Sequence, residues 1–249
     1  MQIEGAIALV TGANGGIGKY YVEALRAAGV SRIYAGARNP NALANLAAID
    51  SQRIIPISLD ITDEQSVSAA ASECKDVNLL INNAGIGLLK GFISATDLSS
   101  ARAEIEVNYF GTLTMCRAFA PVLKANGGGA IVNMLSILGK VNLPMNASYS
   151  ASKAAALLMT QGIRAELAAQ GTLVTGVMPG TVDTEVSKNF PPPKVSPEVV
   201  AQEALQAVID GVEDIYPGEQ AKEMAAQLLG DPKALEKAMA MMLPNSTQG

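Results

Sequence analysis

"ALVTGANGGIGKYYVEAL", residues 8–25, joins an aliphatic run to a glycine-rich turn and then to an amphipathic run. Glycines allow the backbone to turn tightly and to approach a pyrophosphate, and the N-terminus of a following helix offers free N–H groups to it. We therefore expect a strand, a dinucleotide-binding turn and a helix, although a glycine turn can also serve packing alone. The expected cofactor contacts in the turn are Gly12, Asn14, Gly15, Gly16, Ile17 and Gly18.

The rest of the chain alternates in the same way. Short aliphatic or β-branched runs, typical of buried strands, occupy 6–11, 32–37, 54–59, 78–82, 130–135 and 173–178. Longer amphipathic runs, typical of helices, occupy 16–28, 63–73, 97–124 and 149–169. This order predicts an α/β fold with a Rossmann-like, doubly wound parallel sheet of about seven strands and helices on both faces. Without a repeat or a linker-like change in composition, residues 1–249 should form a single dinucleotide-binding domain.

Composition and charge exclude several classes of function. The net charge is −5 and there is no Lys/Arg cluster, so neither nucleic acid nor an anionic membrane is an expected partner. No apolar run approaches the roughly eighteen residues that span a bilayer, and "MQIEGAIALV" has no basic leader, so we expect a cytoplasmic protein. Cys74 and Cys116 lack CxxC spacing and are expected to be reduced, buried thiols.

The chain contains no histidine. This excludes Ser-His-Asp and Cys-His nucleophilic catalysis as well as HExxH zinc sites. No cysteine or carboxylate cluster has the spacing of metal ligands, so no metal site is predicted. Any proton transfer must therefore use another side chain.

A tyrosine and a lysine four residues apart are candidates for that role. They lie at the head of "SYSASKAAALLM", residues 148–159. Four residues are about one helical turn, so Tyr149 and Lys153 share a helix face and their polar ends can converge. By itself, the pair is also typical of a solvated helix surface.

Taken together, the motifs carry a family resemblance. The turn has the spacing TGxxxGxG, "NNAG" (82–85) follows the fourth predicted strand, "VNYFG" (107–111) holds Asn108, "NMLSILG" (133–139) holds Ser136, and YxxxK and "PGTVDT" (179–184) complete the order. With these motifs in this order, the chain resembles the short branch of the short-chain dehydrogenase/reductase family, and within it the NADP-dependent carbonyl and ketone reductases.

The resemblance implies four catalytic residues. Tyr149 is the general acid for carbonyl reduction and the base for alcohol oxidation, and Lys153 holds the nicotinamide ribose. Ser136 hydrogen-bonds the substrate oxygen, and Asn108 fixes a water that links Lys153 to solvent. Free tyrosine has a pKa of about 10, and we expect the Lys153 ammonium, with the charge of an oxidised nicotinamide, to lower it. Taken alone, Ser136 could be an ordinary loop hydroxyl and Asn108 a mid-helix residue satisfied by the backbone.

The resemblance also places further cofactor contacts. Asp60, at the end of the third predicted strand, accepts from the adenine amino group, although an Asp here could instead cap the next helix. The remaining contacts are Ile61, Asn83, Ala84, Gly85, Pro179, Gly180, Val182 and Thr184, the last four at the carboxamide end.

The end of the second predicted strand, "YAGARNP" (34–40), bears on the choice of cofactor. Ala37 stands where NAD-preferring enzymes usually place an acidic residue, and Arg38 follows it. Because a guanidinium pairs with a 2′-phosphate, we predict NADP(H), with NAD(H) as the alternative. The glycine turn lacks the second basic residue of many NADP-preferring relatives, so Arg38 could also be a solvated surface charge.

Residues 185–200 should form a substrate loop. They contain "NFPPPKVSP" (189–197), whose prolines forbid regular helix and favour an exposed, semi-rigid loop. The loop is either a lid or a spacer before a helix that starts near Pro197.

Residues 217–249 should form a variable helical tail. "EDIYPG" (213–218) departs from the short strand and glycine-rich end of many relatives, and a methionine-rich helix begins near Pro232. Core or subunit packing is the expected role of Met239, Met241 and Met242. The resemblance implies a homo-oligomer, either a tetramer or a dimer.

The predicted function is the NADP(H)-dependent interconversion of a ketone or aldehyde with an alcohol, on a small apolar substrate. The alternatives are a non-catalytic NAD(P)-sensing regulator and an epimerase or dehydratase of the same family. The Ser136, Tyr149 and Lys153 set weighs against a regulator, and the glycine spacing weighs against an epimerase. The substrate itself depends on loops 86–96 and 185–200, which carry no chemical signature.

Overall fold

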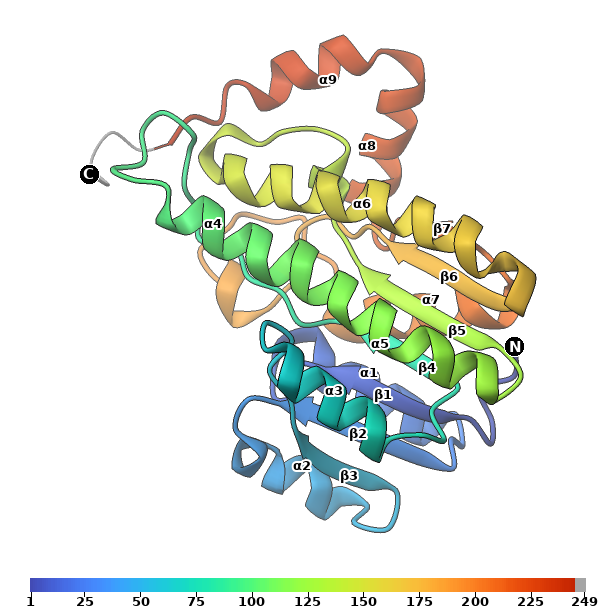
Figure 1. Cartoon of the computed structure of the whole chain (residues 1–249). Helices are drawn as coiled ribbons and strands as arrows, with labels where there is room; N and C mark the ends of the chain where they lie inside the picture. Colours follow the sequence, from blue (N-terminus) through green and yellow to red (C-terminus); the bar gives the residue numbers. More distant parts are fainter. Residues whose placement is uncertain (245–249) are drawn as a thin grey trace.

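The computed structural model describes residues 1–244 and has one parallel sheet with helices on both faces (Figure 1). The strands are β1 (Ile7–Thr11), β2 (Arg32–Ala37), β3 (Ile54–Ser58), β4 (Leu79–Asn82), β5 (Gly129–Met134), β6 (Thr172–Val177) and β7 (Asp214–Ile215). Their spatial order is β3-β2-β1-β4-β5-β6-β7, and all neighbouring pairs are parallel. The predicted doubly wound sheet is confirmed. The order reverses between β1 and β4, where open α/β sheets bind ligands.

The first six strands match the predicted runs to within one residue at each end. β7 corrects one prediction. Residues 213–218 were expected to lack the short terminal strand of many relatives, but they contain one. Gly176 donates from its N–H to the carbonyl of Glu213 (2.7 Å), and Met178 donates to Ile215 (2.9 Å). A two-residue strand has too little pattern to be predicted, and it forms here because the exposed edge of β6 pairs with it.

The helices are α1 (Gly16–Ala27), α2 (Ala44–Ile49), α3 (Glu64–Glu73), α4 (Ser99–Ile105), α5 (Thr112–Ala125), α6 (Ala147–Leu167), α7 (Pro197–Asp210), α8 (Glu219–Gly230) and α9 (Pro232–Met239). The run expected as one helix over 97–124 is split, because a π-helical turn over Glu106–Gly111 separates α4 from α5. α6 begins two residues earlier than predicted, which places Tyr149 in its first turn. The predicted start near Pro197 is confirmed, and the side chain of Ser196 caps that helix.

Two hydrophobic cores lie on the two faces of the sheet. One packs α1, α2 and α7 against residues such as Val10 and Ile81, and the other packs α3, α5 and the end of α6 against Leu9 and Leu80. Because side chains alternate along a strand, neighbouring residues of β1 and β4 serve opposite cores. Both cysteines are free and buried, as expected, and burial raises the pKa of each thiol to about 12.

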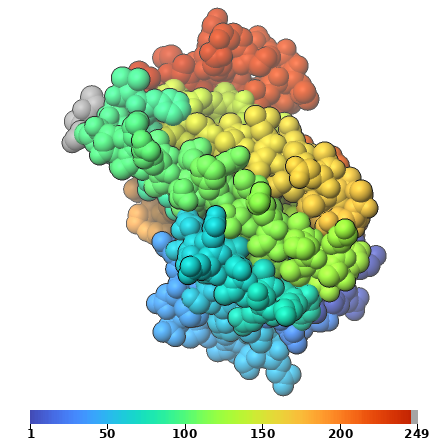
Figure 2. All heavy atoms as spheres, viewed as in Figure 1, coloured from blue at the N-terminus to red at the C-terminus, as the bar shows by residue number. Residues whose placement is uncertain are grey.

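The C-terminal tail forms α8 and α9, which cover the end of the molecule beside the start of α6 (Figures 1 and 2). Met239 packs with Leu235 and Val141, as expected for a core residue. Met241 and Met242 are exposed, so for them the core alternative is wrong. Residues 245–249 of the predicted tail lie outside the described residues. Within residues 1–244, the helices are too short or too polar to span a membrane.

Candidate active site

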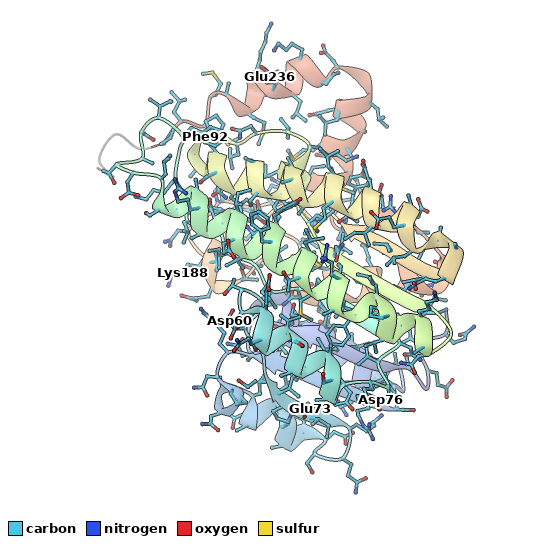
Figure 3. All side chains as sticks on the ribbon, viewed as in Figure 1. Asp60, Glu73, Asp76, Phe92, Lys188 and Glu236 are labelled. Atoms are coloured by element: carbon cyan, nitrogen blue, oxygen red, sulfur yellow. The ribbon has the colours of Figure 1, made fainter. Side chains whose placement is uncertain are left out.

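The predicted site residues gather at the carboxyl edge of the sheet. They come from the turn after β1, the ends of β2 to β6, the π-helical turn and the first turns of α6. Figure 3 shows Asp60, Lys188 and Phe92 along this side of the molecule. The exposed Phe92 lies in the loop before α4, and Lys188 lies in the predicted substrate loop.

The glycine turn is shaped for an anion. Gly12 has φ +63°, and a Cβ added at Gly18 would lie 2.2 Å from the Gly12 carbonyl oxygen, so both positions require glycine. Asn14, Gly15 and Gly16 are exposed. No side chain caps α1 and its first turn has no acidic residue, so no side chain offsets the partial positive charge at this helix N-terminus. The turn therefore fits the pyrophosphate of a dinucleotide.

Thr11 ties this turn to the "NNAG" segment. Its hydroxyl oxygen accepts from the N–H groups of Asn83 and Ala84, both at 2.9 Å. The Asn83 amide donates to the Thr11 and Gly12 carbonyls, at 2.9 and 3.2 Å. Thr11 is the first residue of the TGxxxGxG motif, but sequence reasoning gave it no role, because the partners of its hydroxyl lie more than 70 residues away. The link fixes Ala84 and Gly85 beside the turn.

Asn108 lies in the π-helical turn and is buried. Its oxygen accepts from the N–H of Ile86 (2.9 Å), and its NH₂ donates to the Ile86 carbonyl (2.8 Å) and to the hydroxyl of Ser152 (2.9 Å). Asn108 thus joins the loop after β4 to α6. Both amide hydrogens have protein acceptors, so Asn108 could hold the expected water only through its side-chain or backbone oxygen.

Ser136, Tyr149 and Lys153 meet at one point. The Lys153 ammonium lies 5.7 Å from the centroid of the Tyr149 ring and donates to the carbonyl of Met134 (2.7 Å). The oxygen of Ser136 accepts from the N–H of Leu138 (3.1 Å), and the Ser136 side chain lies close enough to Tyr149 to lower the pKa of that tyrosine against the effect of burial. A Cβ added at Gly85 would lie 3.4 Å from the Lys153 nitrogen. Ser136 thus lies beside Tyr149, and because Lys153 is buried, the Tyr149–Lys153 pair is not a solvated helix surface.

The pKa of Tyr149 moves opposite to expectation. Burial raises it to about 12 and the charge of Glu104 adds to the rise, while the Ser136 hydrogen bond opposes it. Burial also lowers the pKa of Lys153 to about 8. Removal from water disfavours the charged form of both groups, which outweighs the attraction between a phenolate and an ammonium. The protein's own groups thus keep Tyr149 as a neutral proton donor at neutral pH.

Arg38 and Asp60 lie near each other at the ends of β2 and β3. Arg38 is exposed and has no ion pair or hydrogen bond within residues 1–244. Asp60 accepts from the N–H and hydroxyl of Thr62, at 3.0 and 2.7 Å. These bonds, with a smaller effect from the charge of Arg38, lower the pKa of Asp60. The alternative that Asp60 caps a helix is wrong, because Asp63 caps α3; Ile61 beside it is buried.

A family model described as short chain dehydrogenase matches residues 6–194. The chain belongs to the short-chain dehydrogenase family. This family match spans the glycine turn, the Asn108 turn and the Ser136, Tyr149 and Lys153 cluster.

Individual short-chain dehydrogenases are similar over most of the chain. A structure of a short chain dehydrogenase from Burkholderia cenocepacia J2315 in complex with NADP is 48% identical, with a TM-score of 0.91, covering 96% of this chain and 99% of that one. A bulky-bulky ketone specific alcohol dehydrogenase from Comamonas testosteroni is 25% identical, with a TM-score of 0.77, covering 93% and 94%. The short chain dehydrogenase mpl6 from Monascus purpureus is 37% identical over 199 residues, or 75% of this chain and 68% of that protein.

The segment after β6 of this short-chain dehydrogenase is held by the tail. The N–H of Thr181 donates to the side-chain oxygen of Gln220 on α8 (2.7 Å), and a Cβ at Gly180 would lie 2.4 Å from the same oxygen. The Pro179 carbonyl accepts from the N–H of Ile137 (3.1 Å), beside Ser136. Gln220 was missed in the sequence, since nothing in the tail's pattern indicates which residue reaches the site.

The predicted substrate loop returns alongside this segment. Val182 pairs with Val195 in a parallel bridge, and Asp183 donates from its N–H to the Val195 carbonyl (2.8 Å). Lys194 pairs with the carboxylate of Asp183 at 3.3 Å. Thr184 caps the short helical turn Glu185–Ser187. The loop is therefore anchored at both ends, and residues 188–196 form no regular helix, as the prolines predicted.

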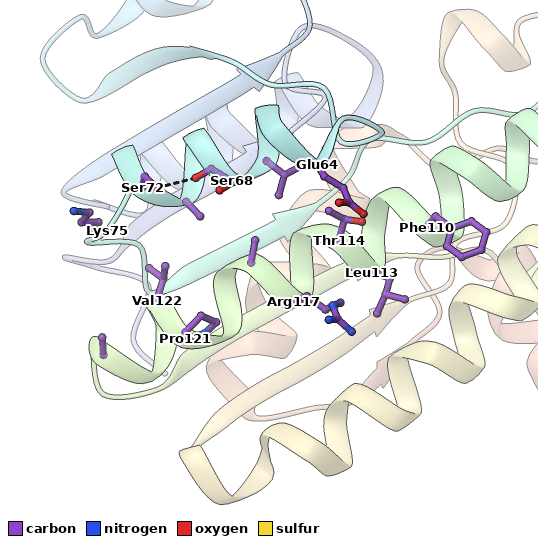
Figure 4. Close-up of a pocket in the computed structure, with 14 residues that line it drawn as sticks. Glu64, Ser68, Ser72, Lys75, Phe110, Leu113, Thr114, Arg117, Pro121 and Val122 are labelled. Carbon is purple, nitrogen blue, oxygen red and sulfur yellow. Dashed lines mark hydrogen bonds between the residues drawn. The ribbon is translucent and has the colours of Figure 1, made fainter.

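A separate groove of about 830 Å³ lies between α3 and α5 (Figure 4). Glu64 and Ser68 come from the α3 side, and Phe110 and Arg117 from the other side. No predicted catalytic or cofactor residue lines it. The groove is thus separate from the site at the carboxyl edge.

Proposed function

We propose that the protein is an NADP(H)-dependent carbonyl reductase that interconverts a ketone or aldehyde with the corresponding alcohol. The observation that carries the proposal is the convergence of Ser136 and Lys153 on a neutral Tyr149 beside the glycine turn. A regulator that only senses the cofactor has no need for this buried cluster, whose two charged forms are costly to bury.

The proposed cofactor contacts follow the geometry of the carboxyl edge. The turn over residues 12–18 holds the pyrophosphate, and Arg38 pairs with the 2′-phosphate, which agrees with the NADP bound to the Burkholderia protein. Asp60 and Ile61 lie at the adenine end, and Asn83 to Gly85 lie between the turn and Lys153. Pro179, Gly180, Val182 and Thr184 line the carboxamide end. When bound, the cofactor supplies a hydride to the carbonyl carbon.

The chain's own residues would then handle the proton. Tyr149 donates its O–H proton to the substrate oxygen as that oxygen gains negative charge, and the hydroxyl of Ser136 donates a hydrogen bond to the same oxygen. The Lys153 ammonium donates to the Met134 carbonyl and keeps two further hydrogens, which can hold ribose hydroxyls. In the reverse direction, the Tyr149 phenolate accepts the proton of the alcohol.

The proposed substrate is an apolar ketone. The loop before α4 exposes the apolar side chains Leu88, Phe92 and Ile93 beside the site. A carbonyl compound with apolar substituents would bury these side chains when it binds. The ketone-specific dehydrogenase from Comamonas testosteroni agrees with this class of substrate.

A panel of apolar ketones, scored by NADPH consumption, tests the reaction. Tyr149→Phe should lower turnover by about 10²-fold or more, because the ring stays and only the proton donor is lost. NADPH affinity, measured by fluorescence titration, should stay nearly unchanged. Tyr34→Phe is the matched control, because its hydroxyl bonds Asp76 at the opposite edge of the sheet (2.9 Å).

Two results would contradict the proposal. Appreciable turnover by Tyr149→Phe would show that another group donates the proton. NADPH binding by the wild type without reduction of any ketone would favour the regulator.

A further inference from the structure

Glu104 on α4 is a buried carboxylate that the proposed mechanism does not use. Its exposure is 0%, and one carboxylate oxygen accepts from the N–H of Leu88 at 2.7 Å. The other oxygen is also buried and has no partner among the protein atoms of residues 1–244. A buried, incompletely paired carboxylate is costly, so its presence beside an active site needs a physical reason.

Glu104 and Asn108 hold the same short segment. They lie one helical turn apart and together make three hydrogen bonds to the backbone of Ile86 and Leu88. Gly87 lies between these two anchors. A Cβ added at Gly87 would lie 3.2 Å from the ring of Tyr149. The clamped backbone of residues 86–88 therefore packs directly on the catalytic tyrosine.

A second unpaired polar side chain lies on the helix that packs beside α4. The helix that carries Asn108 connects β4 to β5, and the helix that carries Ser152 connects β5 to β6. Because these three strands are parallel, both helices run in the opposite direction to the strands and are parallel to each other (Figure 1). Asn108 donates to Ser152 (2.9 Å), and Glu104 and Ser148 lie four residues before these two residues on the same pair of helices. The Ser148 hydroxyl is likewise buried and has no partner among residues 1–244.

These two unpaired atoms complement each other. A carboxylate oxygen accepts and a hydroxyl donates, and buried polar atoms are nearly always paired, directly or through an ordered water. A hydrogen bond of either kind would tie α4 to the residue directly before Tyr149.

We propose that Glu104 is a positioning residue, which holds both the 86–88 segment and the first turn of α6 so that the Tyr149 hydroxyl is oriented for proton transfer. The inference rests on the proposed carbonyl reduction. A tyrosine side chain can adopt several rotamers. Holding the 86–88 segment and the first turn of α6 in place would restrict Tyr149 to one of them.

The charge of Glu104 has a second effect on the same tyrosine. The titratable groups facing Tyr149 are Lys153 on its own helix and Glu104 on α4, and Ser136 faces it from the segment after β5. A carboxylate disfavours a nearby phenolate, so it raises the pKa of Tyr149. Glu104 therefore favours the protonated form, which is the form that reduces a carbonyl.

Three variants of the full chain separate these effects. Glu104→Ala should increase hydrogen exchange at the amides of residues 86–88 and lower kcat by about 10-fold to 10²-fold, with NADPH affinity unchanged. Glu104→Gln keeps an acceptor for Leu88, so it should retain the exchange protection and most of kcat. Glu106→Gln removes the same charge from an exposed position two residues along and should change none of these readouts.

The pH profile provides a test that a merely structural role would not pass. Alcohol oxidation needs the Tyr149 phenolate, so its kcat/KM rises with pH as the tyrosine loses its proton. Glu104→Gln removes the neighbouring negative charge, so this rise should move to lower pH, whereas Glu106→Gln should leave it in place.

Unchanged exchange at residues 86–88 in Glu104→Ala would overturn the clamp, as would an equal increase in Glu106→Gln. If Glu104→Ala does not fold, the pH profile of Glu104→Gln decides, and an unshifted profile overturns the proposal. Hydrogen exchange does not require turnover, so it tests the clamp even if the wild type reduces no ketone. Failure to reduce any ketone would contradict only the proposed function.

Discussion

Tyr149 shows how a buried setting can reverse the simplest electrostatic reasoning at a single residue. The sequence indicated that a lysine one turn away would lower the pKa of the tyrosine, but burial of the tyrosine raises it to about 12. The positive charge of an oxidised nicotinamide was also expected to lower this pKa, and that charge would favour the phenolate when the cofactor is bound. The residues of the site by themselves thus favour the neutral, protonated form of Tyr149.

Ser136→Ala should lower kcat by about 10²-fold to 10³-fold, as the loss of one oxyanion-type donor does. The affinity for NADPH should not change, because the Ser136 side chain lies beside Tyr149 and has no hydrogen bond to the glycine turn. Steady-state kinetics and a binding titration measure the two effects. A change in NADPH affinity with unchanged kcat would show that Ser136 serves the cofactor instead.

Arg38→Ala should raise the KM for NADPH by about tenfold or more and leave that for NADH nearly unchanged, because only NADPH carries the 2′-phosphate. The structure supports this choice, since the guanidinium has no protein partner within the described residues. Arg53→Ala is the control, because that guanidinium is already paired with Asp50 at 2.6 Å. Equal changes for both cofactors would show that Arg38 does not bind the phosphate.

At the scale of elements, the junctions between helices and loops position the candidate catalytic residues more than the regular helices and strands do. The π-helical turn at Glu106–Gly111 places Asn108 opposite Ser152, and the early start of α6 places Tyr149 in a first turn. Both features position catalytic candidates. π-helical turns inside α-helices often occur at functional sites, because the extra residue turns a side chain out of the regular register.

Gly18→Ala tests the contact between α1 and β1. The new Cβ would lie 2.2 Å from the Gly12 carbonyl oxygen and 2.6 Å from the Asn83 amide nitrogen, so the helix must shift away from the turn. We expect a loss of about 1–3 kcal/mol in unfolding free energy, typical of overpacking, together with weaker NADPH binding.

Gly162→Ala is the matched control within a helix. A Cβ there meets no atom within 4 Å, so the substitution should stabilise α6 by about 0.5–1 kcal/mol. Chemical denaturation measures both variants. Normal stability and cofactor binding in Gly18→Ala would show that the close approach at Gly18 is not required.

At the scale of the whole molecule, we predict turnover without a metal. Among residues 1–244, no group of three or more Asp, Glu or Cys side chains is arranged to hold an ion, and the chain has no histidine. Dialysis against a chelator should therefore leave activity unchanged. Loss of activity that zinc or manganese restores would contradict this prediction, and rescue by magnesium would point to a structural ion at a subunit surface.

The predicted homo-oligomer stays a prediction at this scale. The tail meets the site through Gln220 and reaches the short turn before α6 through Met242, whose carbonyl accepts from the N–H of Met145 (3.1 Å). The tail therefore contributes to the site within one chain.

The sequence by itself determined the sheet, the glycine turn and the identities of the catalytic candidates. Buried parallel strands read as continuous aliphatic runs, and a turn that must approach a phosphate requires glycine, so both leave local patterns. Ser136, Tyr149 and Lys153 could be named for the same reason, since each lies at a fixed place in a local motif.

Only the tertiary structure decided which distant residues support those candidates. Thr11, Glu104 and Gln220 act through hydrogen bonds to backbone N–H groups that lie 16 to 73 residues away in the sequence. Such contacts leave no periodicity in the chain. The pKa of Tyr149 was likewise decided by burial, which depends on how α4, α6 and the loop after β4 pack together. Desolvation is a property of the packed site, so local sequence patterns could not show that it outweighs the charge of Lys153.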